Sequence, residues 1–467
     1  MCLDLQKILC SIFLYGFKFF ICFMGRKVKI TKGYDIKIFG SAKKTIKSVI
    51  TSQIVAIEPL DFKNSSLKLL VSEGEEVLAG QGLFFDKNFP EIFIPSPVSG
   101  EIVEIVRVEK RRISHIKILV DKNTNYKPFE IPSELNRDNV KAILLNSGCW
   151  SYIRQRPYDS IPSPESSPKS IFVSLFDTGP LAPDYTFLLK NKNEDLNKGL
   201  EVLGLLSLGN LNIGKNSNSV ELKEQKGIQI HQFIGPHPAG NVGIQIHHID
   251  PLKQGETVWY VNVQDVAIIG KLFNSGQYHA ERIVALVGSG VKEPSYYEVM
   301  TGSSLNEFLD KKVQEDNQRI IQGNILTGKK AESNDYLSFY TNQITVINEG
   351  NHSEFFGWML PGFNKLSVSR SFFSWLNPQK TYNLDTNTHG EERPFVVTGQ
   401  YEKVLPMNIL PVVLLKSILA QDIERMEQLG IYEVSEEDFA LCEFVCTSKI
   451  EVQKIISDGL ELIRREG

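Results

Sequence analysis

The sequence predicts a multidomain α+β protein, because three kinds of pattern follow one another along the chain. Short apolar runs of strand length, separated by glycine, proline, asparagine and aspartate, fill the first part. Helix-length and strand-length patterns then alternate through the middle, and amphipathic helix patterns close the chain. A chain of 467 residues is long enough for roughly three or four domains, each with its own core.

The composition excludes several classes of protein. Apolar residues make up 42% and charged residues 23%, which is typical of a globular protein. The formal net charge is −4 and no basic domain or stripe is present, which argues against nucleic-acid binding. The six cysteines are too scattered for a disulfide framework and favour a reducing compartment: Cys2, Cys10, Cys22, Cys149, Cys442 and Cys446.

Residues 1–23 differ from the rest of the chain. They contain the longest apolar run, residues 8–23, which includes Lys18. A membrane-spanning helix needs about 20 apolar residues, so this run is too short. Met24 follows directly, so we expect residues 1–23 to be an extension upstream of the true start; a membrane-touching anchor is the alternative. Because no other run is long enough to span a membrane, any membrane association is expected to come mainly through partners.

Residues 24–125 are predicted to form an all-β module. At its centre, residues 71–105, glycines stand at turn positions, and Val77, Leu83, Ile102 and Ile105 can point inward. This turn pattern resembles that of biotinyl/lipoyl-type barrel-sandwich domains. Lys87, in Asp86-Lys87-Asn88, stands near the position of a lipoyl-bearing lysine. The stretch that follows is about two residues longer than the lipoyl pattern, so we expect an unmodified structural module.

Three further domains are expected. Residues 126–257 begin with a polar linker and read as α/β. In residues 258–390, strand patterns at 282–287 and 319–323 enclose a helix that Ser304 would cap, which fits a small β-grasp domain. Residues 391–467 are predicted to be helical, with one helix at 412–429 ending before Gly430. A capping box at Ser435–Asp438 is predicted to start another helix, and an apolar stripe follows from Val452 to Ile463.

No motif predicts a metal site, a dinucleotide site or a catalytic residue. Four histidines lie close together in the sequence, but their spacing matches no known zinc site: His231, His237, His247 and His248. Gly288-Ser289-Gly290 follows a strand, yet Pro294 interrupts any helix after it. If Cys446 and Cys442 are taken as the last two ligands of an iron–sulfur motif, Glu436 and Phe439 occupy the first two, so the segment should hold no cluster.

Six long and unusual stretches resemble one family, the NqrA family, which supplies the A subunits of sodium-translocating NADH:quinone reductases. The resemblance runs from about Val28 to Gly467 and leaves out the residues before Met24. The stretches are KITKGY (29–34), GPHPAGNVG (235–243), IDPLKQGETVWYVNVQDVAIIG (249–270), EFFGWMLPG (354–362), YEKVLPMNILPVVLL (401–415) and DFALCEFVC (438–446).

This family is similar to the flavin-binding subunit of respiratory complex I and to the C subunit of the Rnf complex. The resemblance implies a barrel-sandwich domain, a Rossmann-like α/β domain, a β-grasp domain of the SLBB kind and a helical domain, in this order. It also implies that residues 147–154 correspond to a glycine-rich flavin loop. Trp150 and Tyr152 would block the close approach that glycine permits there, so both flavin and cluster binding are expected to be lost.

The resemblance further implies a peripheral subunit of a six-subunit complex, on the cytoplasmic side of the bacterial inner membrane. The other five subunits (B, C, D, E and F) would be its partners, and they would carry the NADH, flavin, iron–sulfur and quinone chemistry that drives sodium export. The candidates for a contact with ubiquinone or with another subunit are His237 and the aromatic residues Phe355, Phe356 and Trp358. The alternative for His237 is a loop or core histidine, and the alternative for the aromatic residues is a buried strand and turn. Two rival functions are a flavin/iron–sulfur NADH dehydrogenase module and a lipoyl or biotinyl carrier.

Overall fold

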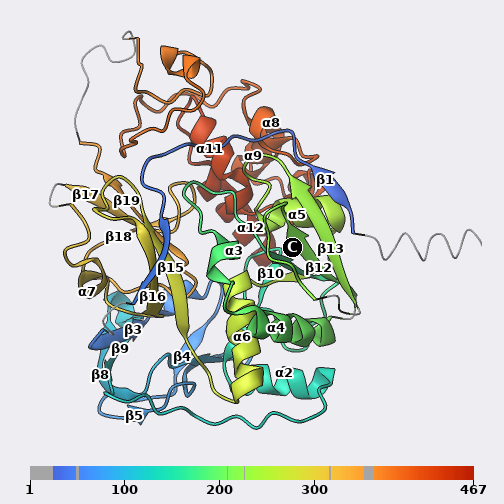
Figure 1. The fold of residues 1–467 in the computed structure, drawn as a ribbon. Coiled ribbons are helices and arrows are strands. Elements are labelled where there is room, and N and C mark those ends of the chain that lie inside the picture. The colour runs from blue at the N-terminus through green and yellow to red at the C-terminus, as the bar shows by residue number, and fades with distance from the viewer. Residues whose placement is uncertain are drawn as a thin grey trace, which may run out of the picture.

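The computed structural model of the protein describes residues 25–48, 52–207, 209–223, 225, 227–314, 317–351 and 361–466. Three sheet-containing bodies and a helical C-terminal body make up the molecule (Figure 1). Phe355, Phe356, Trp358 and the extension at 1–23 lie outside the described residues. Within the described residues, no helix is long and apolar enough to cross a membrane.

The N-terminal body consists of two small antiparallel sheets. One has the order β3 (Ile54–Ile57), β9 (Ile113–Val120), β8 (Gly100–Arg107), β5 (Glu76–Val77), and the other is formed by β4 (Leu67–Leu69), β6 (Gly82–Asp86) and β7 (Phe93–Pro95). Val77, Leu83 and Ile102 are buried as predicted, but Ile105 is only half-buried. The register between β8 and β9 shifts after Ile102, because Val103 is inserted as a bulge and changes the alternation of faces.

The second body is built on a mostly parallel sheet. Its strand order is β1 (Lys27–Lys29), β13 (Ile228–Ile234), β12 (Leu211–Lys215), β11 (Ile171–Ser174), β14 (Val258–Tyr260) and β10 (Arg154–Arg156), and only β10 runs antiparallel to its neighbour. The helices of this body are α2 (Arg137–Asn146), α3 (Tyr185–Leu188), α4 (Asn193–Leu206), α5 (Val242–Ile249) and α6 (Val263–Ser275).

Helices α4 and α6 pack unusually closely, and glycine makes this contact possible. A Cβ atom on Gly270 would lie 1.7 Å from the carbonyl oxygen of Asp195, and one on Gly199 would lie 2.0 Å from that of Val266. Both distances are far below van der Waals contact, so a side chain at either position would force the helices apart.

The third body is a mixed sheet with one short helix. The strand order is β18 (Lys329–Ala331), β17 (Gln318–Gln322), β19 (Gln343–Asn348), β15 (Glu281–Val287), β16 (Ser295–Met300) and β2 (Lys43–Ser48), and α7 (Leu305–Leu309) covers it. Ser304 is the N-cap residue of α7, but its side chain makes no capping hydrogen bond. Leu305, Phe308 and Leu309 are buried on one face of α7.

The first two strands of the chain, β1 and β2, belong to the sheets of other bodies and not to the N-terminal body. Strand β1 pairs with β13 of the second body, and β2 pairs with β16 of the third. The chain therefore ties the two larger sheets together before it enters the small sheets at β3. The domain boundaries inferred from sequence stay a prediction, and residues 27–48 contribute no strand to the barrel-like pair of sheets.

The C-terminal body contains α8 (Tyr401–Val404), α9 (Pro411–Leu419), α10 (Ile423–Gln428), α11 (Ala440–Val445) and α12 (Val452–Glu466). The single helix predicted at 412–429 is wrong, because the chain breaks between α9 and α10. Gln421 has φ of 56°, and the Asp422 side chain accepts a hydrogen bond from Arg425 N–H and so starts a new helix. The predicted stripe on α12 is confirmed: Val452, Ile456, Leu460 and Ile463 are buried.

A buried ion pair joins the second and third bodies. Arg282 on β15 and Asp265 on α6 are 0% and 3% exposed, and their Nη2 and Oδ1 atoms are 2.9 Å apart. Arg282 Nη1 also donates to Asn342 Oδ1 at 3.0 Å. The guanidinium is therefore tolerated inside the protein because its partners replace the lost water.

We expect the R282M variant to be strongly destabilised, because it leaves the Asp265 carboxylate buried without its partner. The free energy of unfolding should fall by about 3–5 kcal/mol, measured by urea denaturation. The control is K311M, which removes a lysine from an ion pair whose side chains are 91% and 66% exposed. This control should change stability by less than about 0.5 kcal/mol, and a similar loss in both variants would contradict the assignment.

Candidate functional site

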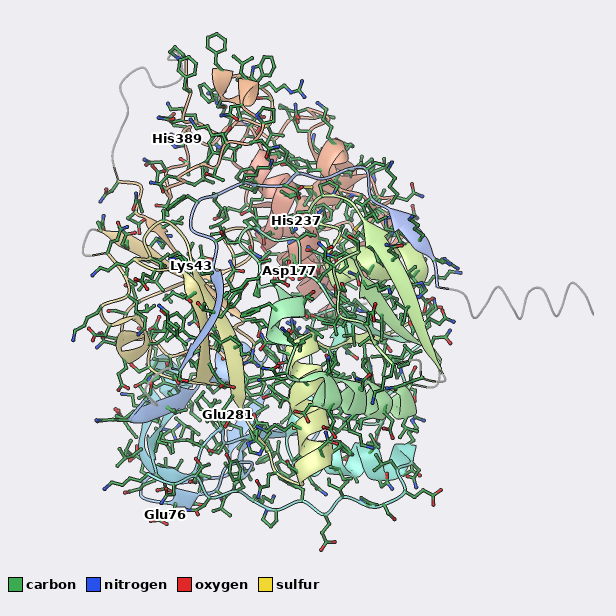
Figure 2. The ribbon with its side chains drawn as sticks, viewed as in Figure 1. Lys43, Glu76, Asp177, His237, Glu281 and His389 are labelled. Carbon is green, nitrogen blue, oxygen red and sulfur yellow. The ribbon has the colours of Figure 1, made fainter. Side chains whose placement is uncertain are left out.

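The carboxyl edge of the parallel sheet brings together His237, Asp177 and Thr178. His237 lies in the loop after β13, and Asp177 and Thr178 lie in the loop after β11; Figure 2 shows His237 and Asp177 near the middle of the molecule. His237 Nδ1 is 3.2 Å from Thr178 Oγ1. The backbone N–H of His237 donates to Asp35 Oδ1 at 2.8 Å, and its carbonyl accepts from Tyr34 N–H at 2.9 Å. The loop is thus held by hydrogen bonds on both sides.

The charges at this edge are set by burial. The His237 side chain is 3% exposed, and desolvation lowers its pKa to about 4, so the ring is neutral at pH 7. Burial also raises the pKa of Asp177, which accepts a hydrogen bond from Gly179 N–H at 2.7 Å. Neither side chain lines the cleft of about 220 Å³ described below. Contact of His237 with a quinone or with another subunit stays a prediction, and the hydrogen bonds indicate a bracing role.

The loop that corresponds to a flavin loop is filled by its own side chains. Trp150 and Tyr152 are each 1% exposed. Trp150 Nε1 donates to the Pro162 carbonyl at 2.9 Å, and the Tyr152 hydroxyl is 2.7 Å from that of Tyr278. Three loop N–H groups, those of Cys149, Ser151 and Ile153, are already bonded within the loop. These residues do not fit a flavin, because neither the space nor those donors remain for its phosphate.

The segment that resembles a cluster loop serves instead as a joint between bodies. Glu436 pairs with Lys63 of the N-terminal body, and Glu437 Oε1 accepts from Arg156 Nη2 on β10 at 2.5 Å. Ser435 and Asp438 form the predicted capping box. A Cβ on Gly243 would lie 2.4 Å from the Asp438 carboxylate, so α5 packs directly on this segment.

Cys442 and Cys446 are buried in the helical core, where Tyr401 contacts both. The Tyr401 hydroxyl donates to Cys446 Sγ at 2.9 Å, and Phe439 is fully buried beside them. Burial raises the pKa of the Cys442 thiol. The segment supplies only two thiols, while Glu436 and Phe439 stand at the other two ligand positions. This segment therefore does not fit an iron–sulfur cluster.

The other candidate residues, the remaining histidines and Lys87, form no common site. His231 bonds Asn212 and Arg26, and His247 bonds Glu433 and Asn408. No group of three or more metal-binding side chains occurs among the residues that the structure describes. Lys87 is exposed after β6, where its backbone N–H donates to the Ser66 carbonyl at 2.9 Å.

One cleft was not predicted from the sequence. It has a volume of about 220 Å³ and lies between α3–α4, α6 and strands β15–β16, with Lys192, Lys271, His279, Glu281 and Glu298 in its lining. Burial raises the pKa of Glu281, but His279 and Lys271 outweigh it and lower the pKa to about 2. The mixed charges suit a small polar molecule. Its residues come from four segments with no shared motif, so no sequence signal could have identified it.

Family models match three parts of the chain: the NqrA N-terminal barrel-sandwich hybrid domain at residues 28–121, the NqrA second alpha/beta domain at 135–278, and the NQRA C-terminal domain at 283–333. The A subunit of the Na(+)-translocating NADH-quinone reductase of Haemophilus influenzae (strain 86-028NP) is 39% identical over 447 residues, which cover 94% of this chain and 100% of that protein. The chain belongs to this NqrA family.

Other relatives of the same name agree. The Rhodopirellula baltica protein is 37% identical over 94% of this chain and 98% of its own length, and that of Yersinia pestis bv. Antiqua is 38% identical over 94% and 100%. Among solved structures, an NAD+-reducing nickel–iron hydrogenase is matched with a TM-score of 0.34 at 10% identity, over 64% of this chain and 55% of that one. A likeness this low carries no argument.

In this member of the NqrA family, we expect the W150A variant to be strongly destabilised. The indole is fully packed and lies edge-on to Trp259 at a centroid distance of 5.4 Å, so its removal leaves a cavity and an unpaired carbonyl. Thermal and urea unfolding should show a loss of about 3–5 kcal/mol. W375A, at a ring that is 45% exposed, is the control and should stay within about 0.5 kcal/mol of wild type; equal losses would contradict the packing argument.

We expect His237 to make folding stability fall at acid pH. Its pKa in the folded protein, about 4, lies below the ordinary value of 6.5, so the unfolded chain binds a proton at a higher pH than the folded protein does. The stability that the neutral buried ring contributes is therefore lost as pH falls from about 6.5 to 4. Between pH 7 and 5, wild type should lose about 2 kcal/mol more than the H237Q variant, measured by urea unfolding. H389Q, at an exposed histidine, should behave as wild type; parallel curves for H237Q and wild type would refute the prediction.

Proposed function

We propose that this chain is the peripheral, cofactor-free subunit of a Na(+)-translocating NADH:quinone reductase, and that it supports the quinone-reducing half of the complex. The observation that carries this proposal is the 39% identity over 94% of the chain and the whole length of a relative of that name. The enzyme is the assembly, and we propose no catalytic residue in this chain.

The packing of the two cofactor-like segments supports the cofactor-free part of the proposal. Trp150 and Tyr152 occupy the flavin-loop region, and Phe439 and Glu436 stand where two cluster ligands would be needed. NADH, flavins, the iron–sulfur centre and quinone would then be handled by the B, C, D, E and F subunits.

We further propose that the second body is Rossmann-like and the third is a β-grasp domain of the SLBB kind. In the parallel sheet, β12 and β13 are added on one side of β11 and β14 is added on the other side, as in doubly wound sheets. In the third body, α7 packs on a mixed sheet. The proposed boundaries remain 24–125, 126–257, 258–390 and 391–467, with 1–23 as an extension.

The proposed location is the cytoplasmic face of the bacterial inner membrane. Phe355, Phe356 and Trp358 remain our proposed contacts with membrane subunits. For His237 we retain a proposed contact with ubiquinone or with another subunit, which would require its loop to open because the ring is buried.

A tagged chain, recovered from gently solubilised membranes of its own organism, tests the proposal by mass spectrometry. We expect co-purification of a flavin- and iron–sulfur-bearing NADH oxidase together with several multi-span proteins. Recovery of the chain alone from the soluble fraction would refute the proposal.

The isolated chain discriminates the two rival functions. We expect no visible absorbance near 450 nm, because the flavin-loop region is filled, and an intact mass without modification of Lys87. Bound flavin would favour the dehydrogenase module, and an added lipoyl or biotinyl mass on Lys87 would favour the carrier.

A further inference from the structure

Residues 361–380 form a protruding segment, drawn in orange at the top of Figure 1, which we call the aromatic segment. It includes a short 3-10 helix, Phe373–Leu376. Four of its large apolar side chains are exposed: Phe363 (60%), Phe373 (54%), Trp375 (45%) and Leu376 (62%). Adjacent exposed aromatic side chains of this kind mark an interaction surface.

The same segment is cationic, although the chain as a whole is not. It contains Lys365, Arg370 and Lys380 and no aspartate or glutamate, whereas the formal net charge of the complete chain is −4. An anionic surface would therefore attract this segment and repel the rest of the chain, which selects one orientation.

The aromatic and cationic groups are interleaved. The Phe363 and Phe373 ring centroids are 6.0 Å apart, and the Arg370 guanidinium lies 5.8 Å from the Trp375 ring. The Lys380 ammonium donates to the Phe363 carbonyl at 2.7 Å. Apolar groups and cations thus share one small region, as in segments that lie at the boundary between lipid headgroups and acyl chains.

The segment is anchored on the protein. Ser374 is 4% exposed, and its hydroxyl donates to the Lys365 carbonyl at 2.5 Å. Lys37 Nζ donates to the Pro378 carbonyl at 2.9 Å, and Phe39 N–H donates to the Tyr382 carbonyl at 3.0 Å. The Ser374 bond holds the segment together internally, and the bonds from Lys37 and Phe39 fix its C-terminal end on the protein. Its exposed side chains are therefore presented by a folded support.

We propose that the aromatic segment binds the surface of an anionic phospholipid bilayer, with Trp375 and Leu376 at the headgroup boundary and the three cations beside the lipid phosphates. This inference rests on the proposed function, because a peripheral subunit is held close to a membrane. A protein partner is the competing occupant, and the absence of any acidic side chain from residues 361–380 favours the uniformly anionic lipid surface.

Tryptophan fluorescence of the complete chain tests the proposal. Trp150 and Trp259 are buried, so a W358F background leaves Trp375 as the only other indole, and it is exposed. Vesicles of phosphatidylglycerol and bromine-labelled phosphatidylcholine should quench this fluorescence at low salt. Quenching should be lost with vesicles that lack phosphatidylglycerol and in the W358F/W375F variant.

Charge variants measured by vesicle co-sedimentation supply the matched comparison. The K365Q/R370Q/K380Q variant should bind phosphatidylglycerol vesicles at least about tenfold more weakly. The control K110Q/K122Q/K311Q removes three exposed lysines elsewhere and should bind as wild type. No quenching, or equal weakening in both triple variants, would overturn the proposal.

Co-purification separates this inference from the proposed function. If vesicles are not bound but the tagged chain still recovers the membrane proteins, the lipid proposal is overturned and the proposed function stands. If K365Q/R370Q/K380Q abolishes that recovery without any vesicle binding by wild type, the segment docks on a protein and the lipid proposal is again overturned. Recovery of no membrane protein would refute the proposed function itself.

Discussion

The buried Arg282–Asp265 pair constrains the arrangement of the two largest bodies. A guanidinium without water contact needs acceptors in fixed positions, and Asp265, Asn342 and Thr301 supply them from three segments. The residue before Asp265, Gln264, bonds both the N–H and the carbonyl of Ile283 on the same strand. Helix α6 is therefore joined to β15 by polar contacts with directional requirements, which apolar packing alone would not impose.

A layer of aromatic side chains packs residues 147–154, the counterpart of a flavin loop, against the bodies that this ion pair joins. Tyr152 stacks on Phe339 at a centroid distance of 4.8 Å and bonds Tyr278, while the Tyr340 hydroxyl donates to the Ser151 carbonyl. The loop is thus packed between the second and third bodies. A Cβ on Gly148 would lie 2.6 Å from the Pro95 ring, so the N-terminal body closes the remaining side. Three bodies meet at this loop, and the side chains that fill it serve all three interfaces.

Features that depend on residues close together in the sequence were predicted, whereas pairings between distant segments were not. The strand turns, the α12 stripe and the Ser435 capping box depend on residues close together in the chain, and they were predicted correctly. The break at Gln421 was missed because apolar periodicity continues across it, although Asp422 is a recognisable N-cap residue. The exchange of β1 and β2 into other sheets has no local signal, since partners such as Gln232 and Tyr296 lie about 200 or more residues away.

The candidate site shows the same division. That Trp150 and Tyr152 would obstruct a flavin followed from the family resemblance, which places them in the counterpart of a flavin loop, and from their size; both side chains are buried. The role of Glu436 and Glu437 did not follow, because their partners Lys63 and Arg156 come from other bodies. Since side chains already fill both cofactor-like regions, the free energy that a bound flavin or cluster would add is not needed to hold these bodies together. Under the proposed cofactor-free role, the fold of this chain therefore does not depend on cofactor loading.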